Sequence, residues 1–344
     1  MTIMENRLAY KLRVVRNMSL GLMKEFVDEI HERTGKNRLS IALDMVHCAR
    51  RFGSGYHDYI TYHFYELTDP YRATYMTRMK SKKLMEYMND RDAASIFDDK
   101  SRFDEVFREF VARDFLDAKN CTREEAARFY RDNKKGFGKK DLTCGTDAEI
   151  LTMEDFADSD AFYDYIKEKE FTVVEEYIVN HEKIREVYPL SLNTMRMITV
   201  IDDEGKPQLF FAAQKFGRDG RFVDVRGLHA PIDLETGTIK FPFHSGDTTT
   251  DDFYTEHPNT GYPLIGFEVP LFEEAKEMIL RAAALIPKMR YVGWDVAVTD
   301  RGPVIVEGND YTAYDYMQLP GQQEGKEGIL PDLFRLVPSL KNVL

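Results

Sequence analysis

Cysteine is scarce in this sequence of 344 residues, which has only three: Cys48, Cys121 and Cys144. Their number is odd, they lie far apart, and none belongs to a C-x-x-C pair. A disulfide framework or a zinc-finger site would need paired, regularly spaced cysteines. The sequence therefore predicts three reduced thiols, as in proteins of a reducing compartment.

Long apolar runs and positive charge are also in short supply. No segment approaches the roughly 20 apolar residues of a membrane-spanning helix, and residues 1–15 lack the apolar centre of a signal peptide. Lysine and arginine number 47 against 59 acidic residues, and the net charge of −12 argues against nucleic acid or an anionic membrane as the main partner. We expect a soluble, cytoplasmic protein with no transmembrane segment.

The chain is long enough to form two or three subdomains around large cores, since 43% of its residues are hydrophobic. Helical patterns dominate its first 95 residues. Asp69 and Pro70 are typical of a helix start, and they predict one helix to about Met88. Another helix is predicted at residues 271–286, where apolar residues share one side and glutamates occupy the first turn.

The clearest pattern is YVGWDVAVTDRGPVIVEGN, residues 291–309. Apolar and polar residues alternate on both sides of a turn at residues 300–302, which predicts a hairpin. A three-residue turn with Gly302 in the left-handed conformation would pair Thr299 with Pro303 and Asp295 with Glu307. Directly opposed residues share a face, so two carboxylates and the carboxamide of Asn309 would project to one side.

Such a face is costly without a cation, because like charges opposite each other repel. A few hard oxygen ligands suit Mg²⁺ that is shared with the phosphates of a substrate. The alternative is the solvated outer face of an amphipathic hairpin. The short Glu-Gly-Asn end after an apolar run favours the metal.

A D-x-A-x-T strand followed by a strand ending in V-x-E-G-N resembles the magnesium-binding hairpin of ATP-grasp enzymes. The resemblance is closest to the branch called sugar-transfer-associated ATP-grasp proteins, and it extends roughly from Gly53 to Pro331. It implies an α+β ATP-grasp fold with a helical N-terminal region (1–95), a small lobe with a phosphate flap (96–180) and a large lobe with the metal hairpin (181–344). It also implies ATP and Mg²⁺ as cofactors, with three metal ligands: Asp295, Glu307 and Asn309.

The resemblance places two lysines near the nucleotide phosphates. Lys100 follows Asp99 at the start of a predicted helix, for which Ser101 is a suitable cap; a surface lysine is the alternative. The second lysine is expected in the segment KKGFGKKDLTCGTDAEIL. Lys139 fits its position best, and Lys140 is the near alternative. This sequence departs from the family pattern there, because Lys140 stands where proline is frequent and the loop keeps only Gly145 where several glycines are usual.

Residues 171–179, FTVVEEYIV, alternate as a strand and are similar to the segment that reads adenine. Backbone groups of four residues would do so: Glu175, Glu176, Tyr177 and Ile178. His181 or Glu182 stands where an acid for the ribose is expected. The alternative is an ordinary strand end with surface acids.

The run S-x-N-T-x-R at residues 191–196 also resembles the branch, and it implies that Arg196 faces the nucleotide. A guanidinium can hold a carboxylate or a phosphate with two hydrogen bonds, as a transferring phosphoryl group requires. His229 lies in another segment that has a counterpart in the branch. It is a candidate general base, a substrate contact or a histidine satisfied by the protein itself.

The resemblance implies an ATP-dependent ligase that phosphorylates a carboxylate and lets an amine displace the phosphate. Arg196 and Lys139 would be its catalytic residues. Its partners would be a small-molecule acid and amine, and the family name suggests sugar-linked substrates in polysaccharide or glycoconjugate biosynthesis. The alternatives are a kinase on the same fold and a nucleotide-binding protein without turnover, which the glycine-poor flap keeps open.

Overall fold

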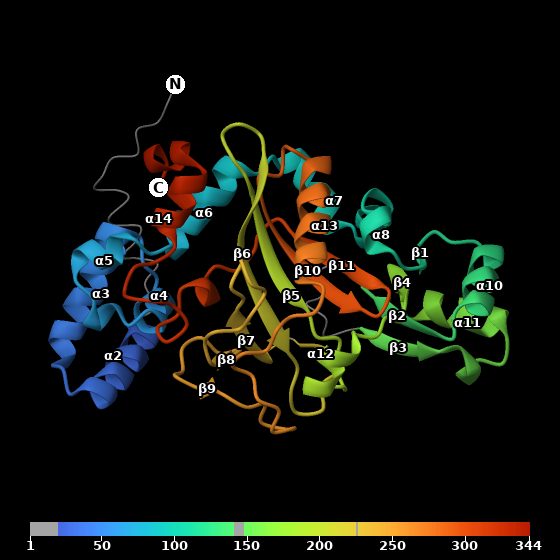
Figure 1. Cartoon of the computed structure of the whole chain (residues 1–344), viewed down its shortest axis with the longest axis horizontal. Coiled ribbons are helices and arrows are strands. Elements are labelled where there is room, and N and C mark those ends of the chain that lie inside the picture. Colours follow the sequence, from blue (N-terminus) through green and yellow to red (C-terminus); the bar gives the residue numbers. More distant parts are fainter. Residues whose placement is uncertain (1–19, 141–147, 225) are drawn as a thin grey trace.

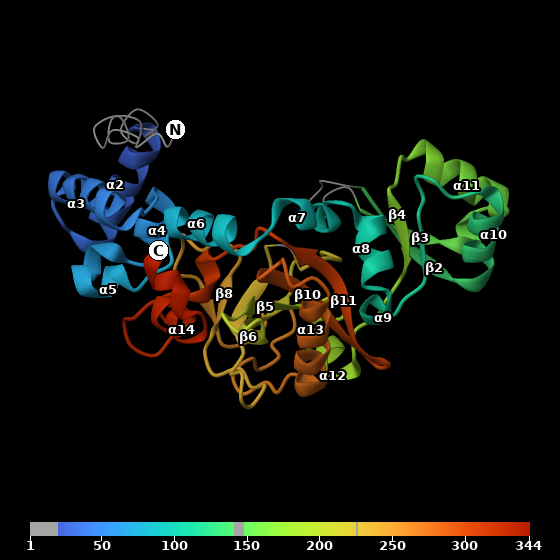
Figure 2. The same cartoon turned by 90° about the horizontal axis from the view of Figure 1, so that it is seen from above.

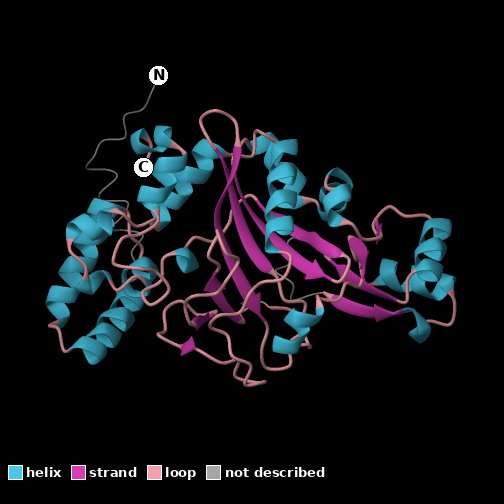
Figure 3. Cartoon of the chain, viewed as in Figure 1, coloured by secondary structure: helices cyan, strands magenta, loops and turns pink. Residues whose placement is uncertain are grey.

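The computed structural model describes residues 20–140, 148–224 and 226–344, so the flap residues Cys144 and Gly145 lie outside the described part. Figure 1 shows a helical region, a large sheet and a smaller sheet that follow one another along the longest axis. The same parts are coloured by secondary structure in Figure 3. The chain is therefore α+β, as predicted, and its N-terminal part is helical. None of its described helices has the length and apolar character that crossing a bilayer requires.

The described N-terminal region consists of short helices packed around aromatic residues. Ile30, Tyr62 and Phe64 are fully buried in this core. The elements are α2 (Leu20–Thr34), α3 (Arg38–Phe52), α4 (Tyr56–Thr61), η1 (Phe64–Glu66), α5 (Asp69–Ala73) and α6 (Arg78–Met88).

The single helix predicted from Asp69 to Met88 is wrong, because the chain leaves the helix between α5 and α6. At this break the backbone N–H of Met76 donates to the side chain of Gln318 (3.1 Å), which donates back to the Met76 carbonyl (2.6 Å). These bonds replace the bonds that a continuous helix would make. They also attach the helical region to the C-terminal part of the chain.

The smaller sheet has four antiparallel strands in the order β1 (Phe115–Leu116), β4 (Val173–Glu176), β2 (Lys135–Lys139) and β3 (Glu149–Thr152). Helices α10 (Arg123–Asp132) and α11 (Ser159–Glu168) lie side by side on it, as the view from above in Figure 2 shows. Phe129 and Phe162 pack from these helices against Leu151 and Val174.

The larger sheet is antiparallel throughout and buried on both faces in its centre. Helix α13 (Phe272–Leu285) confirms the helix predicted at residues 271–286. It packs with Met197, Trp294 and Val296 on one face of the sheet. Helices α6 and α14 (Leu330–Leu336) pack with Ile198 and Val200 on the other. The strand order is β11 (Gly302–Asn309), β10 (Tyr291–Thr299), β5 (Met195–Ile201), β6 (Pro207–Phe216), β7 (Leu228–Pro231), β8 (Phe243–Ser245) and β9 (Phe253–Tyr254).

Short helices connect these parts. Asp99, not Ser101, caps α8, since its carboxylate accepts from the N–H of Arg102 (3.1 Å) while the Ser101 hydroxyl donates to the Thr172 carbonyl (3.4 Å). Lys100 is therefore the first residue of that helix. The remaining short elements are α7 (Arg91–Asp98), α8 (Lys100–Val106), α9 (Arg108–Val111), α12 (Glu182–Val187), η2 (Met153–Asp155), η3 (Asp315–Met317) and η4 (Pro338–Asn342).

Candidate active site

The hairpin of β10 and β11 pairs Asp295 with Glu307, as predicted, but it does so by a different route. Its turn has two residues, so Thr299 pairs with Gly302 and the predicted partner of Thr299, Pro303, is wrong. A bulge then corrects the register: Val296 pairs with Ile305 and Asp295 with Glu307, which leaves Val306 as the extra residue. The bulge places Asp295, Glu307 and Asn309 on one face.

A cavity of about 280 Å³ lies between the two sheets, and it brings most of the predicted site residues together. Lys140 and Lys215 also line it. The predicted residues in its wall are Lys100, Lys139, Glu175, Glu176, Tyr177, Ile178, Arg196, Asp295, Glu307 and Asn309.

His181 and Glu182 do not line this cavity. Both lie at the start of α12, where the His181 ring accepts from the N–H of Lys183 (3.2 Å) and the N–H of Glu182 donates to Asp300 (3.2 Å). The first contact caps the helix, and the second holds its start to the turn of the hairpin. A contact with the ribose remains a prediction for either residue.

Asp295 is held by two cations on the cavity floor. Arg196 donates to both of its carboxylate oxygens (2.8 and 3.0 Å), and the Lys215 ammonium lies 3.1 Å from one of them. Burial opposes the charge of Asp295, but the two cations outweigh it and lower the pKa of Asp295 to about 2. Arg196 also donates to the Thr312 hydroxyl (3.0 Å), so its guanidinium has a fixed orientation.

Glu307 and Asn309 fit a magnesium ion better than Asp295 does. The Glu307 carboxylate makes no hydrogen bond or ion pair with any described residue, and one end of the Asn309 carboxamide is buried without a partner. An amide can present its oxygen in place of its nitrogen by rotation. Among the described residues no group of three or more acidic, histidine or cysteine side chains could hold a metal alone. This donor set suits Mg²⁺ that takes its other ligands from phosphates and water.

Lys139 belongs to a buried charge cluster at the opposite wall. Its ammonium lies 2.7 Å from the Glu175 carboxylate, which Arg113 also contacts at 3.0 Å. Burial disfavours the charge of Glu175, but Arg113 and Lys139 outweigh it and hold its pKa below the usual value. The contact between Asp104 and Arg113 is longer, at 3.4 Å. Burial together with the nearby charge of Glu175 raises the pKa of Asp104.

Several residues of the site are not evident from the sequence. Lys215 stands in an apolar run of β6, and its ammonium bridges Asp295 and Asp224 (3.3 Å). Asp224 in turn accepts from the N–H and the hydroxyl of Thr194 (2.8 and 2.6 Å). The position of Lys215 among the apolar residues of β6 is a sequence signal that could have indicated a buried, paired cation. The partners of Arg113 have no such signal.

A row of polar side chains crosses one face of the larger sheet. The registers of neighbouring strands place Asp295 beside Arg196, Lys215 beside His229, and His229 beside His244. His229 is only 8% exposed, and its Nε2 has no hydrogen-bond partner among the described residues. This does not fit a histidine satisfied by the protein itself. Burial, with help from His244 and Lys215, lowers the pKa of His229 to about 3, so the ring is neutral near pH 7.

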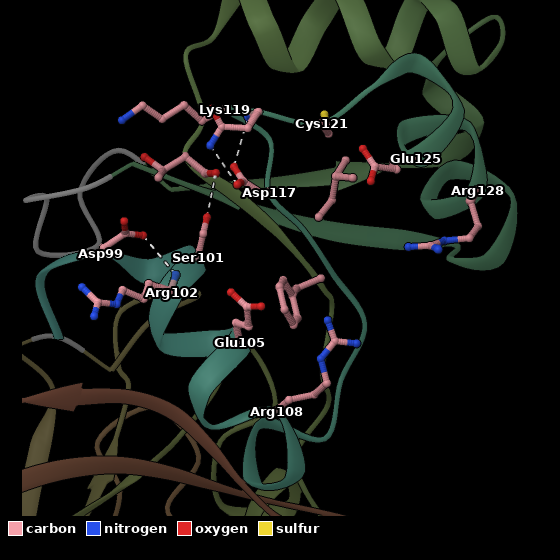
Figure 4. Close-up of a pocket in the computed structure, with 14 residues that line it drawn as sticks. Asp99, Ser101, Arg102, Glu105, Arg108, Asp117, Lys119, Cys121, Glu125 and Arg128 are labelled. Carbon is pink, nitrogen blue, oxygen red and sulfur yellow. Dashed lines mark hydrogen bonds between the residues drawn. The ribbon is translucent and has the colours of Figure 1, made fainter. Parts of the chain in front are cut away.

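A second cavity, of about 500 Å³, lies between α8 on one side and β1 and α10 on the other (Figure 4). Arg102, Glu105, Arg108 and Arg128 in its wall are exposed. Acidic and basic groups alternate around it, and it includes none of the predicted site residues. It is therefore not the candidate active site.

An antiparallel sheet that carries paired acids, facing a smaller sheet that carries a lysine, is the arrangement expected of an ATP-grasp protein. The chain belongs to the sugar-transfer-associated ATP-grasp family, whose model matches residues 144–331. No curated protein matches the sequence.

Solved structures resemble the chain at low identity. The ATP-grasp ligase PsnB, complexed with a minimal precursor, Mg and ADP, is 15% identical with a TM-score of 0.43, over 74% of this chain and 62% of that one. The D-alanine–D-alanine ligase of Coxiella burnetii is 11% identical with a TM-score of 0.42, over 78% and 67%. Biotin carboxylase of Campylobacter jejuni is 9% identical with a TM-score of 0.46, over 76% and 53%. The chain thus spans less than two thirds of the length of PsnB.

Proposed function

We propose that this protein is an ATP- and Mg²⁺-dependent ligase that activates a carboxylate as an acyl phosphate for attack by an amine. The observation that carries the proposal is the distribution of charge around one cavity. Lys100 and Lys139 lie among its lining residues together with the oriented guanidinium of Arg196. Glu307 and the amide nitrogen of Asn309, which also line it, have no partner among the described residues. Such a cavity can hold a nucleotide whose phosphates share a metal with the hairpin.

The residues divide the work of phosphoryl transfer. Bound Mg²⁺ would offset the charge of the phosphates and orient them. Lys100 and Lys139 add positive charge along the nucleotide, and Arg196 holds the acid beside the transferring group. The carboxylate oxygen forms a bond to the terminal phosphorus as the bond to ADP breaks. The amine then attacks the acyl carbon, phosphate leaves, and the amine loses a proton.

A kinase on the same fold is the second candidate, since the same metal and phosphate site would serve transfer to a hydroxyl. His229, the candidate general base, does not line the cavity, and its pKa of about 3 is too low for an efficient proton acceptor near pH 7. For the ligase, we propose an acid or amine from polysaccharide or related glycoconjugate synthesis. Only the description of the family supports that choice.

The metal assignment is tested by Glu307→Gln, which removes charge and keeps volume. We expect this variant to unfold at the same temperature as the wild type and to lose turnover and the gain in ADP affinity that Mg²⁺ provides. Isothermal titration calorimetry with and without Mg²⁺ measures that gain. Glu274→Gln on the exposed side of α13 is the control. An unchanged gain in Glu307→Gln would refute the metal assignment.

A further inference from the structure

Arg113 connects the two walls of the cavity. It lies between α9 and β1, and its side chain is 0% exposed. Its guanidinium contacts Glu175 in β4 (3.0 Å), and it donates to the carbonyls of Ile305 (2.6 Å) and Val306 (3.3 Å) in β11. One buried cation thus joins a strand of the smaller sheet to a strand of the larger one.

The contacts with β11 fall at the bulge. Val306 is the extra residue that sets Glu307 opposite Asp295. A bulge leaves backbone groups without partners in the ladder, and buried carbonyls need donors. Arg113 supplies donors to the bulged residue and to the residue before it, so it fixes the segment that aims Glu307 into the cavity.

The contact between Arg113 and Glu175 affects Lys139, which pairs with the same carboxylate. The Glu175 side chain is only 6% exposed. If Lys139 turned toward a phosphate without another cation present, Glu175 would remain as an unpaired buried charge, which is strongly unfavourable. Because Arg113 stays in place, Lys139 is free to exchange its partner for a phosphate oxygen.

We propose that Arg113 is a positioning residue that couples the phosphate-binding lysine of the smaller sheet to the metal-binding glutamate of the larger sheet. Nucleotide and Mg²⁺ would then bind cooperatively through it. This inference rests on the proposed function, since it assumes that Lys139 meets phosphate and Glu307 meets metal. It predicts that a change at Arg113 weakens the metal-dependent part of nucleotide binding most.

The experiment uses the full chain with ADP as the probe, titrated calorimetrically with Mg²⁺ and with EDTA. Arg113→Lys keeps the charge beside Glu175 but cannot reach both carbonyls of β11. We expect its metal-free ADP affinity to stay within about twofold of wild type and its Mg²⁺-dependent gain to fall about tenfold. Arg113→Met should lower the metal-free affinity as well, because Lys139 then becomes the only cation on Glu175.

Arg301→Met is the matched control. Arg301 also joins this hairpin to β4, through Glu176 (2.8 Å), but its side chain is 65% exposed and lies away from the bulge. We expect its gain from Mg²⁺ to equal that of wild type. A purely structural arginine would instead lower the unfolding temperature and reduce both ADP affinities alike. If Arg113→Lys loses both ADP affinities equally, or if its Mg²⁺-dependent gain in ADP affinity is unchanged, the inference is overturned and the proposed function is not. If the wild type itself shows no gain in ADP affinity with Mg²⁺, the proposed function is overturned together with the inference.

Discussion

Lys139 and Lys140 are adjacent in sequence, and Lys139 belongs to the charge cluster around Glu175. Its ammonium contacts Glu175, and both lysines line the cavity. A lysine held beside the phosphate site gives a charge-assisted contact of about 1.5–3 kcal/mol, so Lys139→Met should weaken ATP binding roughly 10- to 100-fold. Calorimetric titration with ATP measures the loss. The reverse result, normal binding by Lys139→Met and weak binding by Lys140→Met, would shift the predicted register by one residue.

His229 provides a test through the pH dependence of stability. Its pKa is about 3 in the folded chain and about 6.5 in an unfolded one. The folded state therefore disfavours the protonated ring, and this contribution to stability, complete above pH 6.5, is lost as the pH falls toward 3. Relative to His229→Gln, the wild type should lose about 2 kcal/mol of unfolding free energy between pH 7 and pH 5. Denaturant titrations at both pH values measure the difference.

A constant difference between the two proteins would mean that the ring of His229 is solvated in the folded chain. Such a ring could be protonated in place without loss of stability. His257 also has a lowered pKa, caused first by burial. It is present in both proteins, so its contribution cancels from the comparison.

At the scale of elements, the hairpin separates what its sequence predicts from what it does not. Alternation predicts the two strands and places the acids on one face. The predicted turn has one residue too many, and the bulge at Val306 restores the pairing of Asp295 with Glu307. The consecutive apolar residues Ile305 and Val306 are the only sign of the bulge. The break before α6 has no local sign, because its partner Gln318 is 242 residues away from Met76.

Gly308 should be intolerant of a side chain. A Cβ at this position would lie 2.6 Å from Cε2 of Phe103 and 2.7 Å from Cε1 of Phe97. Gly308→Ala should therefore push α7 and α8 away from β11 and cost about 1–3 kcal/mol of unfolding free energy. Since Lys100 begins α8, ADP affinity should fall too. Denaturant unfolding checks the first effect, and the double variant with Phe97→Leu should recover part of it. A fully stable Gly308→Ala would contradict the close packing.

At the scale of the whole molecule, the resemblance in sequence anticipated the α+β fold and most of the residues that meet in the cavity. It did not anticipate Lys215 and Arg113. Their partners lie far away in the sequence: Lys215 meets Asp295, and Arg113 meets the carbonyls of β11. Such contacts depend on how the two sheets are packed, which periodicity does not encode. The division of the chain at residues 95 and 180 remains a proposal.

The central claim is that a carboxylate becomes an acyl phosphate in this cavity, and hydroxylamine tests it most directly. A mixed anhydride reacts with this nucleophile, whereas a phosphate ester does not. With ATP, Mg²⁺ and a panel of uronic and amino acids, we expect release of ADP and phosphate and a hydroxamate of one acid, detected by mass spectrometry. Arg196→Ala should suppress the product, because the guanidinium no longer holds the acyl phosphate. A stable phosphorylated alcohol with no hydroxamate would contradict the ligase and establish the kinase.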